Sequence, residues 1–304
     1  MAVIEVQDVV KKFGDYAAVN HVSFEVEPGR IFGLLGPNGA GKTTTIRMLT
    51  NIYVPDEGMV KVLGETAGPK QQEQIGYLPE ERGLYKKIKV LEQIAYFGQL
   101  KGMDRNDAIA AGKKWLRDLD AGDWENKKIQ ELSKGMQQKI QFITTILHDP
   151  EVLIFDEPFS GFDPVNVELL KKVISDLRDQ GKTIILSTHV MEQVEQMCDD
   201  ICLINKGKVM LSGKVRDIKK GYGRDTVLLE FDGDDSFLDG LKNINIINKS
   251  KNRIEFRFGD SPHDAKEILK KALATTDVYK YELSEPSLNE IFIDVVSRKE
   301  EKDG

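Results

Sequence analysis

The chain has no long hydrophobic run, no cysteine pair at metal-site spacing and no excess of basic residues. No apolar run in its 304 residues approaches the roughly 20 residues of a membrane-spanning helix. The first residues hold no basic stretch before an apolar core, so we expect no signal peptide. With 43 Lys and Arg against 50 Asp and Glu, the net charge is −7, and no nucleic-acid partner is expected. A membrane role would therefore need a partner chain.

Cysteine is scarce, and its two positions indicate packing rather than chemistry. Cys198 and Cys202 lie in a hydrophobic stretch, and their spacing fits neither a zinc ribbon nor a disulfide framework. We expect both to be buried and reduced, which suits a reducing cytosol.

Hydrophobic patterning predicts a large doubly wound α/β domain. Short β-branched or apolar runs predict strands, the last three of them buried on both faces, at residues 3–10, 22–27, 31–35, 152–155 and 183–186. A polar, hairpin-like stretch ends near Tyr77. Apolar residues at helical spacing predict helices at residues 42–50, 90–122 and 133–148, with Ser133 as the expected N-cap of the last helix. We expect this first domain to cover residues 1–221, with a helical subdomain at about 86–150.

A smaller domain is predicted for residues 222–304, after the polar segment KKGYGR at 219–224. Its expected order is strand, helix, strand, strand, helix, strand, at residues 226–231, 236–241, 244–248, 253–258, 263–273 and 278–283. That order favours a ferredoxin-like α+β fold. A last amphipathic helix is expected at residues 287–296.

The glycine-rich segment GPNGAGKT lies between an apolar strand and a helix and fits the phosphate-loop pattern G-x-x-x-x-G-K-[ST]. Backbone N–H groups at such a loop surround phosphate oxygens, and the helix N-terminus adds partial positive charge. Lys42 is expected to reach the β- and γ-phosphates of ATP, and Thr43 to bind Mg²⁺. A glycine-rich turn that matches by chance is the alternative. The expected nucleotide-binding residues here are Gly36, Pro37, Asn38, Gly39, Ala40, Gly41, Lys42, Thr43 and Thr44.

Two carboxylates follow another apolar strand, in the segment VLIFDEP at residues 152–158. Ligands of parallel sheets bind at the carboxyl ends of strands. Asp156 is therefore expected to hold Mg²⁺, and Glu157 to act as general base on the attacking water. Without the phosphate loop, a solvated acidic turn would explain the pair equally well.

Further motifs in the same order give the chain a resemblance to the ATP-binding cassette (ABC) ATPase family. LSKGMQQK at residues 132–139 resembles the family signature, matched by Ser133 and Gly135, although Lys134 and Met136 depart from it. In that family the segment contacts the γ-phosphate bound by the other protomer. The resemblance thus implies a head-to-tail dimer, of two identical or two different ATPase subunits.

The same resemblance assigns roles to four more residues. Asp163, in the run SGFD, is similar to the residue that crosses the dimer interface, and His189 resembles the histidine that contacts the γ-phosphate. Tyr16 resembles the aromatic residue that stacks on adenine. Glu80 stands where the family usually has a glutamine that binds Mg²⁺; a carboxylate can serve, with added negative charge. Each could instead be an ordinary strand-end or packing residue.

The function that the resemblance implies is ATP hydrolysis that powers a separate polytopic membrane permease. The chain would then be cytoplasmic and peripheral on the inner face of the cell membrane. The ending SEPSLNEIFIDVV is similar to bacterial drug- or sodium-efflux subunits, which favours export.

Three other functions are alternatives to this one. A soluble ABC ATPase that remodels ribosomes or DNA remains open, although this chain has one phosphate loop and no room for a long coiled coil. The C-terminal unit could be a small-molecule sensor. A kinase or small GTPase would not explain the signature segment together with His189.

Overall fold

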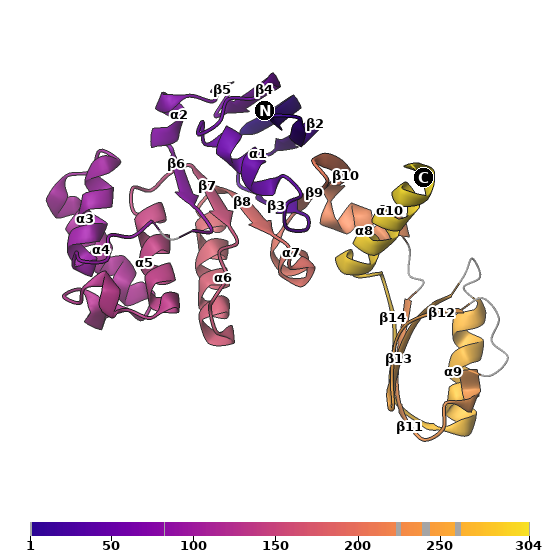
Figure 1. Ribbon diagram of the computed structural model, residues 1–304. Coiled ribbons are helices and arrows are strands. Elements are labelled where there is room, and N and C mark those ends of the chain that lie inside the picture. The colour runs from indigo at the N-terminus through magenta and orange to yellow at the C-terminus, as the bar shows by residue number, and fades with distance from the viewer. Residues whose placement is uncertain (1, 82, 223–225, 239–243, 259–262, 304) are drawn as a thin grey trace. The chain divides into compact units, whose positions relative to one another are not determined.

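The computed structural model describes residues 2–81, 83–222, 226–238, 244–258 and 263–303. The chain forms two compact units, Met1–Lys214 and Val215–Gly304 (Figure 1). The domain boundary expected at residues 221 and 222 stays a prediction. Among the described residues, no helix combines the length and the apolar character needed to cross a bilayer.

The site of the first unit is built on a six-stranded sheet in the order β10-β9-β3-β8-β7-β6. Neighbouring strands are parallel except β10 with β9. Every residue of β3, β7 and β8 is buried, as expected for strands covered on both faces. The strands are β3 (Ile31–Leu35), β6 (Ile75–Leu78), β7 (Val152–Asp156), β8 (Thr183–Thr188), β9 (Asp200–Asn205) and β10 (Lys208–Lys214).

A second, antiparallel sheet has the order β2-β1-β4-β5. Its apolar face shares one core with the parallel sheet, where Phe24 stacks on Phe32 with ring centroids 5.1 Å apart. The stretch expected to be hairpin-like holds the β4–β5 hairpin, then helix α2 (Pro69–Glu73) and the parallel strand β6. The antiparallel strands are β1 (Ile4–Phe13), β2 (Tyr16–Val26), β4 (Glu57–Val62) and β5 (Glu65–Thr66).

Helices connect the strands and form the helical insertion. The interval expected to be helical at residues 90–122 contains α3 (Val90–Leu100) and α4 (Arg105–Asp118), separated by a turn at Gly102, which has a φ of 83°. Helix α5 (Lys134–Ile146) begins at Ser133, whose hydroxyl accepts a hydrogen bond from the Met136 amide. The core helices are α1 (Lys42–Leu49), α6 (Pro164–Asp179) and α7 (Met191–Met197).

The second unit has an antiparallel sheet in the order β12-β13-β11-β14. This is the order of a ferredoxin-like sheet, so the predicted fold class is confirmed. Where a first helix was expected, residues Ser236–Leu238 form one 3₁₀ turn, and 239–241 lie outside the described residues. The elements are α8 (Val215–Tyr222), β11 (Thr226–Asp232), β12 (Ile244–Ser250), β13 (Arg253–Phe258), α9 (His263–Thr275), β14 (Asp277–Ser284) and α10 (Leu288–Asp303).

Both cysteines are packing residues, as expected. Cys198 and Cys202 are free and buried. Burial raises the pKa of the Cys202 thiol to about 12, so it stays protonated at neutral pH.

Helices α3 and α4 pack closely because a glycine faces the contact. A Cβ added at Gly112 would lie 2.6 Å from Cγ2 of Ile94. We expect Gly112→Ala to lower the free energy of unfolding by about 1–2 kcal/mol, because overpacking outweighs the gain in helix propensity. The matched control is Gly122→Ala in the same unit, where an added Cβ would meet only Cγ of Arg117 at 3.8 Å, and it should leave stability unchanged or slightly higher. Equal urea unfolding midpoints for both variants, followed by circular dichroism, would contradict this packing.

Candidate functional site

The phosphate-loop segment turns from β3 into α1 and requires glycine at two positions. Gly36 and Gly41 have φ values of 148° and 108°, which side chains rarely allow. A Cβ at Gly36 would overlap the carbonyl oxygen of Ile204, and one at Gly41 would overlap that of Ala18. The backbone can therefore follow this path only if the residues at positions 36 and 41 have no side chain.

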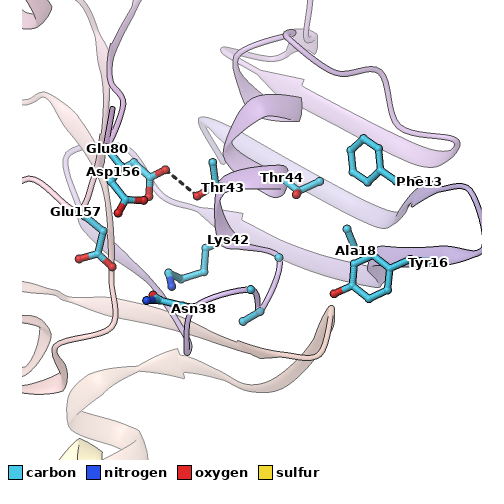
Figure 2. A pocket seen from close by; sticks show the side chains of 13 residues that line it. Phe13, Tyr16, Ala18, Asn38, Lys42, Thr43, Thr44, Glu80, Asp156 and Glu157 are labelled. Carbon is cyan, nitrogen blue, oxygen red and sulfur yellow. Dashed lines mark hydrogen bonds between the residues drawn. The ribbon is translucent and has the colours of Figure 1, made fainter. Parts of the chain in front are cut away.

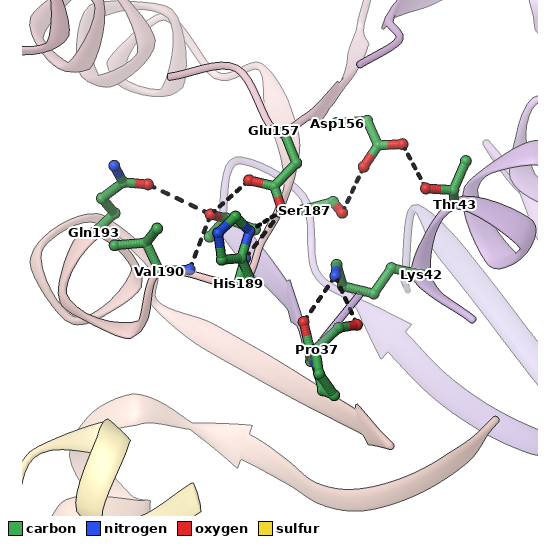
Figure 3. Close-up of polar contacts among 11 residues, drawn as sticks. Pro37, Lys42, Thr43, Asp156, Glu157, Ser187, His189, Val190 and Gln193 are labelled. Carbon is green, nitrogen blue, oxygen red and sulfur yellow. Dashed lines mark hydrogen bonds and ion pairs between the residues drawn. The ribbon is translucent and has the colours of Figure 1, made fainter. Parts of the chain in front are cut away.

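Lys42 is the first residue of α1, and its ammonium group is held by backbone oxygens of the loop (Figure 3). Its Nζ donates to the carbonyl oxygens of Gly36 at 2.7 Å and Pro37 at 3.2 Å. Burial lowers the pKa of Lys42, while the charges of Glu157, Asp156 and Glu80 oppose that shift. The site thus combines one buried lysine with three nearby carboxylates.

Asp156 ends strand β7 and is held by two hydroxyl groups. Its Oδ2 accepts from Thr43 Oγ1 at 2.9 Å, and its Oδ1 accepts from Ser187 Oγ at 2.7 Å. The side chain is almost fully buried, and this burial raises the pKa of Asp156. Thr43 and Asp156, 113 positions apart, supply adjacent oxygen atoms of the type that Mg²⁺ prefers.

Glu157 is paired with His189 at the ends of strands β7 and β8. The Glu157 backbone is left-handed, with a φ of 50°, and its side chain is 10% exposed. Its Oε1 lies 2.7 Å from Nδ1 of His189 and accepts from the His189 amide at 3.1 Å. Its Oε2 accepts from Thr188 Oγ1 at 3.1 Å. The two residues predicted for hydrolysis therefore meet directly.

A cavity of about 510 Å³ opens beside these groups (Figure 2). Its size falls in the range of small-molecule and cofactor sites. Glu80 reaches it from the loop after β6, and the exposed ring of Tyr16 lies at its other end with Phe13. The lining residues are Phe13, Tyr16, Ala18, Asn38, Gly39, Ala40, Gly41, Lys42, Thr43, Thr44, Glu80, Asp156 and Glu157.

Six predicted site residues are not among those that line this cavity: Gly36, Pro37, Ser133, Gly135, Asp163 and His189. Ser133 caps α5, and a Cβ at Gly135 would lie 3.5 Å from the carbonyl oxygen of Gly161. Asp163 caps α6, where it accepts from the Asn166 amide at 3.0 Å. Within one chain, the signature segment therefore lies against residues 161 and 162 rather than at the phosphate loop.

Sequence reasoning missed Phe13, Ser187 and Thr188. The signal for the two hydroxyls was available, since they end a buried strand and a parallel neighbour would carry them to the same sheet edge. The register pairs Asp156 with Ser187, but strand order is not written in a single sequence. Phe13 faces the site because the β1–β2 hairpin pairs it with Tyr16.

A second cavity, of about 370 Å³, lies between β6, the loop after it and helices α3 and α5. Burial lowers the pKa of His148 in this cavity to about 4, and the charge of Lys101 adds to the shift. The lining is mostly apolar and comprises Gly76, Tyr77, Pro79, Gly83, Leu84, Phe97, Leu100, Lys101, Gln141, Thr144, Thr145 and His148.

Comparison with known proteins gives matches over both units. Residues 19–160 match the family described as "ABC transporter", and residues 213–296 match the "ATP-binding protein DrrA1-3-like, C-terminal domain". The ABC transporter ATP-binding protein YhaQ of Bacillus subtilis is 43% identical, over 96% of this chain and 98% of that one. A Nod factor export ATP-binding protein of Burkholderia lata is 37% identical over 70% and 71% of the chains. A solved ATP-binding subunit of an ABC transporter is 28% identical with a TM-score of 0.68, over 73% and 93%.

The buried His148 predicts a loss of stability on acidification. Its pKa of about 4 lies below the ordinary value of about 6.5, so its contribution is complete above pH 6.5 and declines as the pH falls toward 4. We expect the free energy of unfolding to fall by about 1 kcal/mol from pH 7 to pH 5 on this account, after allowing for partial exposure. In His148→Gln, urea unfolding at the two pH values should show a decrease in the free energy of unfolding that is smaller, by that amount, than in the unaltered protein. An equal decrease in both proteins would exclude this role.

Proposed function

The chain belongs to the ABC transporter family of ATP-binding, ATP-hydrolysing subunits, and we propose that it powers export through a separate membrane permease. The observation that carries this proposal is the convergence of Lys42, Thr43, Asp156 and Glu157 on one cavity at the edge of a parallel sheet. Export is supported by a relative whose name is Nod factor export ATP-binding protein.

In the proposed site the phosphate loop and Lys42 hold the triphosphate of ATP. The ammonium group already donates to two loop carbonyls, so it is oriented before the nucleotide arrives. Tyr16 offers an exposed ring at the far end of the cavity, suited to stacking on adenine.

Thr43, Asp156 and Glu80 are the proposed ligands of Mg²⁺. All three present oxygen atoms in the same cavity, and two are already joined by a hydrogen bond. When bound, Mg²⁺ would neutralise charge on the β- and γ-phosphates. Ser187 acts as a support, because its hydroxyl fixes the second oxygen of Asp156.

Glu157 is the proposed general base for the attacking water. Its carboxylate is held from one side by Thr188 and from the other by His189, which leaves it directed rather than free to rotate. Glu157 would orient the water and accept its proton, and His189, whose side chain is 53% exposed, would contact the γ-phosphate.

Ser133, Gly135 and Asp163 are proposed to act across a dimer of ATPase subunits. They lie outside the cavity of their own chain, so a second cassette is needed to bring such groups to the nucleotide. ATP binding would then close the dimer, and hydrolysis would reopen it.

The second cavity is the proposed contact with the permease. It lies beside the loop that carries Glu80, so a partner seated there would sense the state of the phosphate site. Leu84, Phe97 and Leu100 provide its apolar wall. The chain would then act on the cytoplasmic face of the membrane, held there by its partner.

Replacing the proposed base gives the first test. Glu157→Gln keeps the shape of the side chain but cannot accept the proton of water. We expect ATP affinity to stay within about threefold and the turnover rate to fall at least about 100-fold. An ATP-bound dimer should accumulate, measured by size exclusion with light scattering.

The control is Glu151→Gln, at an exposed carboxylate just before β7. It should leave hydrolysis and oligomeric state unchanged. Hydrolysis by Glu157→Gln at the rate of the unaltered protein would remove Glu157 from this role.

Identification of the partner gives the second test. Tagged Glu157→Gln would be purified with Mg²⁺ and ATP from detergent-solubilised cells, and copurifying proteins identified by mass spectrometry. We expect a polytopic membrane protein in stoichiometric amount. Recovery of only ribosomal or DNA-associated proteins would overturn the transporter role in favour of soluble remodelling.

A further inference from the structure

Gln141, in the second turn of α5, reaches across to the loop that carries Glu80. The side chain is only 5% exposed. Its Nε2 donates to the carbonyl oxygen of Glu81 at 3.0 Å and to that of Pro79 at 3.3 Å. Since only the amide nitrogen can donate to carbonyl oxygens, these two partners determine the orientation of the amide.

The two carbonyls that Gln141 binds belong to the residues on either side of Glu80. A backbone segment fastened at both neighbours has little freedom between them, so this contact restrains the point from which the Glu80 side chain projects. Figure 2 shows that side chain beside Asp156, within the phosphate cavity. Gln141 itself does not line that cavity; it lines the second one.

The position of Gln141 is itself firmly held. The hydroxyl groups of Thr144 and Thr145 donate to its backbone carbonyl at 2.8 and 2.9 Å. Its amide oxygen Oε1 is buried and has no hydrogen-bond partner among the described residues. A buried acceptor without a partner destabilises the fold, so packing alone would favour an apolar residue here. The amide is better explained by its two bonds to the loop.

Holding Glu80 in place has an electrostatic consequence. The charges of Glu80, Asp156 and Glu157 all act on Lys42, and the four residues line one cavity, so the lysine proposed to bind the phosphates has three carboxylates near it. Nucleotide without a divalent cation would meet this negative charge directly, whereas a bound cation would neutralise it. The position of the Glu80 carboxylate should therefore affect how strongly binding depends on the cation.

We infer that Gln141 is a positioning residue that holds Glu80 in the phosphate site and so makes the site favour metal-bound nucleotide over free nucleotide. This inference rests on the proposed function, because it needs ATP and Mg²⁺ in this cavity. It also connects the site to the signature segment: Gln141 and Ser133 lie eight residues apart along one helix, about 12 Å.

The test measures equilibrium binding of a non-hydrolysable ATP analogue to the full chain, in Mg²⁺ and in EDTA. The readout is the ratio of the two dissociation constants. Gln141→Met keeps the length of the side chain but donates no hydrogen bond, and we expect it to lower the preference for the Mg²⁺ form about 3- to 10-fold. The matched control is Gln72→Met. The side-chain amide of Gln72 also donates to a backbone carbonyl, that of Thr50 at 2.7 Å, but Gln72 lines neither cavity, so its ratio should stay within about twofold.

A double-mutant cycle with Glu80→Gln identifies the route of the effect. If Gln141 acts through Glu80, adding Gln141→Met to Glu80→Gln should change the ratio less than about twofold. An unchanged ratio in Gln141→Met, or a full decrease in the Glu80→Gln background, would overturn the positioning role and leave the proposed function standing. Absence of nucleotide binding by the unaltered protein would overturn both. Gln141→Leu, which likewise donates no hydrogen bond and adds no charge, serves if Gln141→Met unfolds, and thermal melting checks each variant.

Discussion

The parallel pairing of β3, β8 and β7 is the constraint on which the site depends. It places the loop after β3, the hydroxyls at the end of β8 and the carboxylates at the end of β7 along one sheet edge. Each carboxylate then finds its donor on the neighbouring strand: Asp156 from Ser187, and Glu157 from Thr188. The strands can hold polar groups there because their interiors are apolar and fully buried.

Charge balance is the second theme of the site. A buried lysine surrounded by Glu80, Asp156 and Glu157 is poorly suited to a bare polyanion and well suited to one that carries a cation. The proposed Mg²⁺ and ATP therefore complete the site electrostatically. Gln141 connects helix α5 to this group of charges, because its side-chain amide donates to the two backbone carbonyls that flank Glu80.

The sequence predicted those elements whose structure depends on residues close together in the chain. A glycine-rich loop between a strand and a helix restricts its own backbone, and the apolar runs before Asp156 and in β8 are too short and too uniformly buried to be surface helices. The failures occurred where distant partners decide the structure. Strand β6 lies at the end of the stretch expected to be hairpin-like, and it pairs in parallel with β7 instead. The expected helix after β11 is reduced, in its described part, to a 3₁₀ turn.

The sequence by itself determined the glycine-rich turn from β3 into α1, the acidic end of β7 and the two-part α/β and ferredoxin-like organisation, because each depends on residue types at short spacing. Only the tertiary structure decided which side chains touch. Glu157 with His189, Thr43 with Asp156, and Gln141 with the loop around Glu80 are separated by 32 to 113 positions, and the spacing of residues along a chain does not encode strand order or the direction of a buried side chain. Those contacts follow from how sheets and helices pack, since burial of side chains stabilises the fold only when the whole core assembles.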